Sequence, residues 1–259
     1  MVDYAYSVAG FAVGVIVGLT GVGGGSLMTP LLVLGFGVPA VTAVGTDLLY
    51  AGITKCGGAA SHAIKGHVDW RVAGLLAAGS VPASILALLA IKALPPAGAE
   101  ARLLVSTSLG FMLLVTALAL AFRRRALAWA IENADAPWFA RNRSALTIGV
   151  GAFIGAAVSF SSVGAGALGV TALILLFPLL ATVRIVGTDI AHAVPITLVA
   201  GAGHALLGNV NWPMLASLLV GSLPGIFLGA HLATRFPERA VRHSLVAVLA
   251  FAGGKLVLS

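Results

Sequence analysis

The chain has 259 residues, of which 59% are hydrophobic and 9% are charged, and its mean hydropathy is +1.07. Soluble globular domains carry about 25% charged residues, so this composition excludes a soluble domain and indicates a polytopic helical membrane protein. A net charge of +7 would suggest nucleic-acid binding in a soluble protein. Here the basic residues lie between apolar segments and act as topology signals, so we expect no nucleic-acid partner.

Ten apolar segments follow one another along the chain, five on each side of a polar connector at 123–143. The connector contains three consecutive arginines, and its two tryptophans favour the headgroup region. We therefore expect one integral membrane domain, with a first repeat at 1–122, a cytoplasmic amphipathic connector at 123–143 and a second repeat at 144–259. The predicted apolar segments are 6–20, 26–36, 40–62, 70–94, 102–122, 145–159, 167–180, 183–207, 212–234 and 240–258.

The two halves resemble each other at a nearly constant spacing. Val-Gly-Thr-Asp occurs at 44–47 and again at 186–189, which is 142 residues later. The same spacing relates Gly-His-Val-Asp-Trp at 66–70 to Gly-Asn-Val-Asn-Trp at 208–212. Several uncommon residues recur in register, so the sequence indicates an internal duplication.

Each half contains a glycine-rich break, Thr-Gly-Val-Gly-Gly-Gly-Ser at 20–26 and Ser-Ser-Val-Gly-Ala-Gly-Ala at 161–167. Broken backbone at membrane depth is tolerated where it lines a cavity, and paired breaks in corresponding halves point to a transport site. The alternative is that the glycines serve only close helix packing. The segments beside the first break, 6–20 and 26–36, are shorter than the roughly 20 residues of a full crossing.

Charge placement indicates how the halves are related. If each break is the tip of a hairpin, each half crosses the membrane an odd number of times and the repeats are inverted. Eleven Lys and Arg residues then lie inside, three lie outside, and Lys55 lies within the membrane. Parallel halves would give eight against six. The positive-inside rule favours an all-α protein with two inverted repeats, each a glycine-broken helical hairpin followed by three transmembrane helices, with both termini outside.

The breaks are candidate anion sites, because a helix that starts after Gly25 or Gly166 directs free N–H groups and its positive dipole end toward the membrane centre. Neighbouring hydroxyls add donors. The candidate substrate-binding residues at the two breaks are Thr20, Gly23, Gly24, Gly25, Ser26, Ser161, Ser162, Gly164 and Gly166.

Several ionisable side chains fall inside apolar segments, where they are functional candidates by default. Lys55 is interpreted as an anion ligand, with a structural salt bridge as the alternative. Asp47 and Asp189 are candidates for proton coupling or, equally, for capping and helix–helix hydrogen bonds. His192 lies three residues after Asp189 and shares its face, so it either titrates beside this carboxylate or donates to a carbonyl. His204 lies near a segment end and is expected at the interface.

In these residues and motifs the chain resembles the sulfite exporter TauE/SafE family, also called toluene sulfonate uptake permeases. The resemblance implies secondary transport of small sulfur-containing anions, such as sulfite or organosulfonates, across the bacterial inner membrane. It also implies that Thr46 and Thr188 border the substrate. The chain departs from the common pattern by an Asp after each Gly-Thr and by Lys55. The resemblance rests on 18–25, 44–46, 66–70 and 79–82 and on the second-half motifs at 162–166 and 221–225.

We therefore expect a secondary active transporter that works by alternating access, with the anion at mid-membrane between the two breaks. Its expected partners are a small anion, the lipid bilayer and a coupled proton, and the chain leaves open whether it forms a homodimer. A passive anion channel is the first alternative. An intramembrane enzyme is the second, but no Gly-x-Ser-x-Gly or His-Glu-x-x-His motif is present. The single cysteine, Cys56, argues against a cysteine-cluster metal site, and no metal or cofactor is expected.

Overall fold

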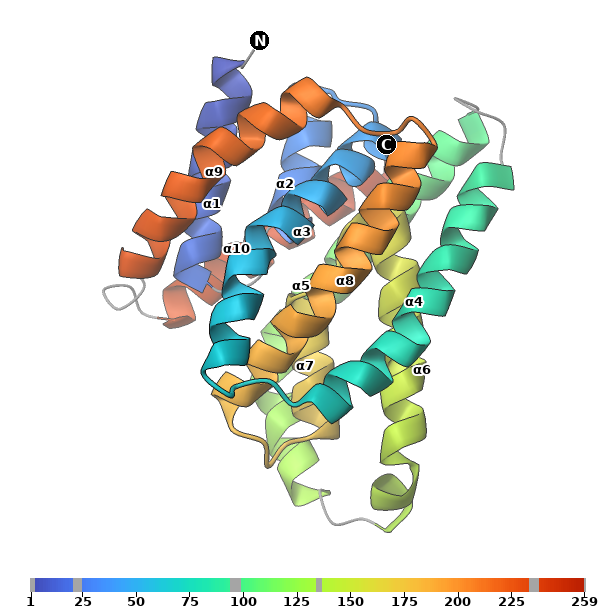
Figure 1. The fold of residues 1–259 in the computed structure, drawn as a ribbon, viewed down its shortest axis with the longest axis vertical. Coiled ribbons are helices and arrows are strands. Elements are labelled where there is room, and N and C mark those ends of the chain that lie inside the picture. The colour runs from blue at the N-terminus through green and yellow to red at the C-terminus, as the bar shows by residue number, and fades with distance from the viewer. Residues whose placement is uncertain (1–2, 21–24, 94–98, 134–136, 233–237, 259) are drawn as a thin grey trace.

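A computed structural model describes residues 3–20, 25–93, 99–133, 137–232 and 238–258. These residues form helices joined by short turns, and no strand occurs in the described ranges (Figure 1). The first half contains α1 (Tyr4–Thr20), α2 (Gly25–Pro30), the π-helical turn η1 (Leu31–Gly35), α3 (Ala40–Ile64), α4 (Trp70–Ala93) and α5 (Ala99–Glu132). The second half contains α6 (Pro137–Ser161), α7 (Ala167–Leu176), α8 (Thr182–Leu206), α9 (Trp212–Leu232) and α10 (Glu238–Leu258).

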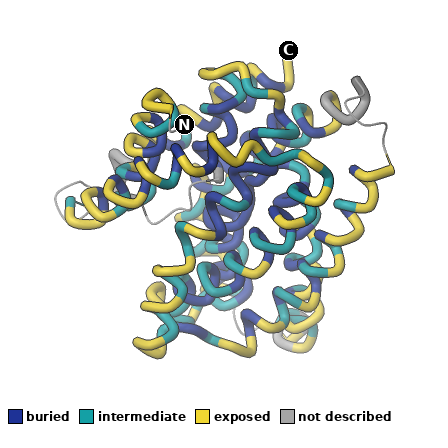
Figure 2. Tube along the Cα trace, turned by 45° about the horizontal axis from the view of Figure 1, so that its top comes forward, coloured by how far each residue is buried: buried dark blue, intermediate teal, exposed yellow. Residues whose placement is uncertain are grey.

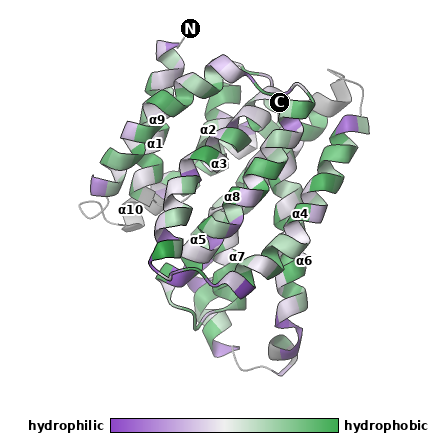
Figure 3. Cartoon of the chain, in the orientation of Figure 1, coloured by the Kyte–Doolittle hydropathy of each residue, from purple (hydrophilic) through white to green (hydrophobic). Residues whose placement is uncertain are grey.

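Five helices of the described chain are long and apolar enough to cross a membrane, namely α4, α5, α6, α8 and α9. Hydrophobic residues, in green, are spread along the helices, and the most hydrophilic residues, in purple, lie mainly near helix ends (Figure 3). The prediction of an all-helical, multi-pass membrane protein is therefore confirmed. Helix α3 has the length of a span, at 25 residues, but is not among the five.

The predicted connector is not a separate element. Helix α5 continues through the three arginines at 123–125 to Glu132, and α6 already begins at Pro137. Both helices therefore extend well past the apolar segments predicted at 102–122 and 145–159. Arginine and alanine are good helix formers, so the change to polar composition does not end α5.

Helices of one half pack mainly against helices of the other. Helix α1 packs along α9, α6 packs along α4, and α3 packs along α8, while α5 packs along α10. The α1–α9 and α6–α4 pairs are equivalent in the repeat, because α6 is the counterpart of α1 and α4 is the counterpart of α9. Each pair therefore joins one helix from each half. In the view of Figure 1, α3 descends toward the lower left and α8 rises toward the upper right.

Glycine allows the two outer pairs, α1–α9 and α4–α6, to approach at backbone contact. A Cβ at Gly79 of α4 would lie 1.9 Å from the Ile148 carbonyl oxygen of α6. At the corresponding place, a Cβ at Gly221 of α9 would lie 1.8 Å from the Ser7 carbonyl oxygen of α1. Small residues at such spacings permit tight helix pairs in membranes. Each outer pair is therefore a closely joined unit.

Buried residues concentrate along the middle of the bundle, and exposed ones cover its outer helices (Figure 2). The largest hydrophobic cluster joins the α2–η1 segment to α5 and α10, with fully buried Met28, Leu32 and Leu113. A second cluster surrounds Leu48 of α3 and Ile196 of α8. Helices α3 and α8 thus form the centre on which the short broken helices rest.

Candidate functional site

The second glycine break has the local structure that its sequence predicts. Helix α6 ends at Ser161, whose hydroxyl donates to the Ala157 carbonyl at 2.6 Å and accepts from the Val163 N–H at 3.1 Å. The backbone then takes φ values of 57° at Ser162, 128° at Gly164 and 140° at Gly166. Residues with side chains rarely adopt such values. This geometry turns the chain from the end of α6 into α7.

The first break falls mainly outside the described residues. Helix α1 is described up to Thr20 and α2 from Gly25, while Gly23 and Gly24 lie in the undescribed range between them. Ser26 is buried. The roles predicted for this break stay predictions.

Asp47 connects the two broken segments. Its Oδ2 accepts hydrogen bonds from the Thr29 hydroxyl, in α2, and from the Ser162 hydroxyl at 3.0 Å, in the second break. The residue is fully buried, and its Oδ1 has no hydrogen-bond partner among the described residues. One carboxylate on α3 therefore holds both broken segments against the central helix.

Lys55 contacts the same break two turns further along α3. Its ammonium donates to the Ala165 carbonyl at 2.7 Å, and the residue is half-buried. Asp189 and Asp47 are the carboxylates whose charges act on this ammonium. The spacing of eight residues, about 12 Å along a helix, keeps Lys55 and Asp47 apart. The two side chains instead hold opposite ends of the second break.

Asp189 lies against the first turn of α7. A Cβ at Gly169 would be 1.8 Å from its Oδ1, so the carboxylate occupies space that a larger residue at this position would need. This Oδ1 is buried without a hydrogen-bond partner in the described part of the chain. Thr171 corresponds to Thr29 but donates to the Ala167 carbonyl at 2.7 Å. The two aspartates, equivalent in sequence, therefore have different surroundings.

His192 and His204 both lie inside the bundle on α8. His192 is within 2.8 Å of the Ser80 hydroxyl on α4 through its Nε2, so its partner is a hydroxyl and not the carbonyl that was one of the two expectations. The Nε2 of His204 lies 2.9 Å from the Ser159 carbonyl oxygen of α6. His204 is fully buried and lies in the last turn of α8, so the prediction that it lies at the membrane interface stays a prediction. Tight packing of α4 and α6 on α8 covers this helix end.

Thr46 and Thr188 bind turns of the chain and do not lie at the break. The Thr188 hydroxyl accepts from the Asp69 N–H at 2.9 Å, and the Thr46 hydroxyl accepts from the Asn211 N–H at 3.0 Å. Asp69 and Asn211 correspond in the repeat and cap their following helices in the same way. The structure therefore brings Asp47, Lys55, Asp189 and the second break together and uses the two threonine hydroxyls elsewhere.

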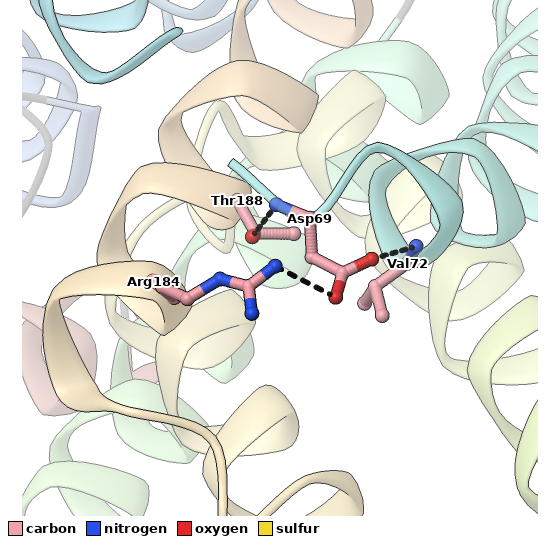
Figure 4. Close-up of polar contacts among 4 residues, drawn as sticks. All are labelled: Asp69, Val72, Arg184 and Thr188. Carbon is pink, nitrogen blue, oxygen red and sulfur yellow. Dashed lines mark hydrogen bonds and ion pairs between the residues drawn. The ribbon is translucent and has the colours of Figure 1, made fainter. Parts of the chain in front are cut away.

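One of these turns carries an additional ion pair. The Arg184 guanidinium donates to Asp69 Oδ2 at 3.3 Å, while Asp69 Oδ1 accepts from the Val72 N–H (Figure 4). The other turn has the neutral Asn211. Arg184 and Asp69 are 43% and 25% exposed, so the pair lies where solvent screens it.

We expect Asp69→Asn to lower the unfolding free energy by only about 0.5 kcal/mol, since partly exposed ion pairs contribute little and Asn can cap the helix. Thr188→Val should cost about 1–3 kcal/mol, because it leaves the Asp69 N–H without an acceptor. Thermal unfolding of the two purified variants in detergent checks this order. Equal losses would contradict it.

Three features of the site were absent from the sequence predictions. Thr29, the second donor to Asp47, was not selected, although its counterpart Thr171 lies at the same repeat spacing. Gly169 was read as part of an apolar segment. The Ala165 carbonyl was not predictable, because every residue carries such an acceptor.

Comparisons with known proteins identify the family of the chain. The sequence model of the family described as sulfite exporter TauE/SafE matches residues 6–256. A probable membrane transporter protein of Bacillus subtilis (strain 168), YjnA, is 37% identical over 254 residues, covering 96% of this chain and 97% of the relative. A probable membrane transporter protein of Xylella fastidiosa (strain Temecula1 / ATCC 700964) is 30% identical, covering 88% of this chain and 83% of the relative. No solved structure matches the chain significantly. The chain thus belongs to the sulfite exporter TauE/SafE family and is a multi-pass membrane transporter.

Proposed function

We propose that the protein is a secondary active transporter of a small sulfur-containing anion, sulfite or an organosulfonate, in the bacterial inner membrane. The anion binds at mid-membrane beside the second glycine break and crosses by alternating access. Asp189 carries the coupled proton, with Asp47 and His192 as the other candidates. The name of the matching family supports the substrate class.

One observation carries the proposal, the position of the Lys55 ammonium at the start of α7. The ammonium has three donors, and one of them is directed at the Ala165 carbonyl. In the first turn of the ten-residue helix α7, the Gly169 N–H already donates to the Gly164 carbonyl and the Val170 N–H to the Gly166 carbonyl. The N–H groups of Ala167 and Leu168 are therefore the donors left for a ligand, and they carry the partial positive charge of the helix. Two kinds of donor therefore converge on one place, which suits an oxyanion.

Asp189 beside this place supports proton coupling. An ionised carboxylate repels an anion bound next to it, whereas a protonated one does not. Anion binding would therefore favour uptake of a proton by Asp189, and release of the anion would favour loss of that proton. This linkage is reciprocal by thermodynamics.

Inverted repeats would supply the alternating motion. The exchanged packing of α1 with α9 and α6 with α4 supports a pseudo-twofold relation, and the opposite courses of α3 and α8 in Figure 1 support an axis in the membrane plane. The excess of Lys and Arg at one set of helix ends supports both termini being outside.

A thermal-shift panel tests the proposal. Sulfite, sulfate, thiosulfate and small sulfonates are each added to the purified protein at two pH values, because a ligand that binds only the folded state raises its apparent stability. We expect stabilisation by sulfite or a sulfonate, and a larger one at the lower pH. If no sulfur anion raises the unfolding temperature, the proposed substrate class is wrong.

Asp189→Asn separates transport from coupling. In proteoliposomes it should retain exchange of labelled sulfite across the membrane, since an amide resembles a protonated carboxyl, but it should lose stimulation by a pH gradient. Wild-type flux that does not saturate and ignores the pH gradient would instead favour the anion channel.

A further inference from the structure

The second half of α3 is uncovered, whereas the equivalent part of α8 is covered. Along α8, Thr197, Ala200 and His204 are at most 1% exposed. Their counterparts on α3, 142 residues earlier, are Lys55, Gly58 and His62, and all three are half-buried. Two helices related by an internal repeat thus have unequal cover at equivalent depths.

The uncovered segment of α3 has a composition unlike that of a lipid-facing helix. It reads Lys-Cys-Gly-Gly-Ala-Ala-Ser-His from 55 to 62, without a large apolar side chain. Cys56 and Ser61 are exposed. A Cβ at Gly57 would meet no atom within 4 Å, and one at Gly58 would meet only Ile190, at 3.8 Å. Small and polar side chains beside open space, next to a lysine, indicate contact with water.

The cover of α8 shows which contacts are missing from α3. On α8, the Leu88 side chain of α4 contacts Gly203, and the Ser159 carbonyl of α6 meets the His204 ring. By the repeat spacing, the counterparts of Leu88 and Ser159 in the other half are Ala230 of α9 and Gly18 of α1, and those of Gly203 and His204 are Ser61 and His62. Ser61 and Ala230 are both exposed. The His62 Nδ1 is buried without a hydrogen-bond partner within the described ranges.

We infer that residues Lys55–His62 line a water-filled passage that leads to Lys55 from the end of α3, and that the α1–α9 pair is its gate. In the closed form, Gly18 and Ala230 contact His62 and Ser61, as α6 and α4 contact α8 at the opposite end. Lys65 and Arg71 follow this end of α3, so the passage opens to the cytoplasm. This inference rests on the inverted repeats of the proposed function.

The close seam between α1 and α9 makes them suitable as one gate. Their backbones touch at Gly14, where a Cβ would lie 2.6 Å from the Ser222 carbonyl oxygen, and at Gly229, where it would lie 2.1 Å from the Val15 carbonyl oxygen. Two helices packed at this distance move together as one rigid body. Rocking of one unit against a fixed centre is the motion expected of repeat transporters.

Cys56, the single cysteine of the chain, reports directly on the passage. A membrane-impermeant, positively charged methanethiosulfonate is added to inside-out and to right-side-out vesicles that contain the wild-type protein. We expect labelling only in inside-out vesicles. The matched control is Cys56→Ser/Ala200→Cys, which places the thiol at a covered position of α8, the counterpart of Gly58 (Ala200 is 0% exposed), and should lose labelling from both faces.

Two outcomes would overturn the passage. One is reaction of Cys56 with a membrane-permeant maleimide but with the charged reagent from neither side, which would mean that the segment faces lipid. The other is labelling from the outside alone. The labelling needs no substrate. If Cys56 is labelled as expected but the protein does not transport sulfite, the proposed passage stands and only the proposed substrate is wrong.

Cross-linking tests the gate. In the Cys56→Ser background, the pair Ser61→Cys and Ala230→Cys should form a disulfide under a mild oxidant, and this bond should abolish labelled-anion flux until it is reduced. The pair Leu88→Cys and Gly203→Cys, at the end already closed, is the positive control. A control pair that cross-links while the Ser61 and Ala230 pair does not would reject α1–α9 as the gate.

Discussion

Replacement of Lys55 by alanine is expected to reduce anion flux about 100-fold, because a hydrogen bond from a charged group contributes about 1.5–3 kcal/mol and a factor of ten corresponds to about 1.4 kcal/mol. The Ala165 carbonyl would lose its donor. An anion at the start of α7 would then lack the ammonium that balances its charge. The measurement is the initial rate of labelled sulfite uptake into proteoliposomes, per molecule of reconstituted protein.

The neighbouring substitution Cys56→Ala is the matched control. Cys56 is exposed, and the one hydrogen bond of its side chain to a described residue lies within its own helix, to the Gly52 carbonyl, so this variant should transport like the wild type. Thermal unfolding of Lys55→Ala distinguishes a lost site from a lost fold. Wild-type flux in a stable Lys55→Ala protein would mean that the ammonium holds the second break in place and does not bind the anion.

The second large effect is expected at the contacts between outer helices. Gly79→Ala and Gly221→Ala each place a methyl group less than 2 Å from a backbone carbonyl oxygen of the paired helix. Backbone atoms cannot rotate away, so each variant should lose about 3 kcal/mol of stability, the upper part of the range for overpacked sites. Size-exclusion chromatography in detergent and the unfolding temperature measure the loss.

Gly74→Ala controls for the change from glycine to alanine. It lies on the same helix as Gly79, and its added methyl group would meet no atom within 4 Å. Alanine favours the helix by about 1 kcal/mol over glycine, so this variant should be as stable as the wild type or more so. If Gly79→Ala matched it, α4 and α6 would not pack at the distance described here.

Much of the fold could be predicted because apolar length and repeated motifs are local properties of the sequence. Apart from α5 and α6, the helices begin and end close to the predicted segments, and the second break lies where its glycines do. The exchange of partners, α1 with α9 and α6 with α4, could not be predicted, because hydropathy does not record which apolar surface covers which. The end of α5 was missed for another reason. Its last turns continue as helix in polar sequence.

The site could be predicted less completely than the fold. Rare charges in apolar segments identified Asp47, Lys55 and Asp189, because burying a charge is costly without a reason. Their partners were less accessible to sequence reasoning. Lys55 binds a backbone carbonyl, and Asp47 binds hydroxyls from two segments that are far apart in the chain. The repeat also suggested equal roles for the two aspartates. Their surroundings differ, because the side chains that contact them lie outside the repeated motif.

The exchange of partners between the halves has a consequence for synthesis and ancestry. Helix α1 leaves the ribosome early, but the surface that its glycines fit, on α9, is made only after α8. The first half therefore enters the membrane with its closest contacts unmade and completes them when the second half arrives. An ancestor with one copy of the unit would have faced the same incompleteness and could have satisfied it only with a second molecule. The packing of the present chain therefore resembles that of a dimer whose two subunits have been joined end to end and have since diverged.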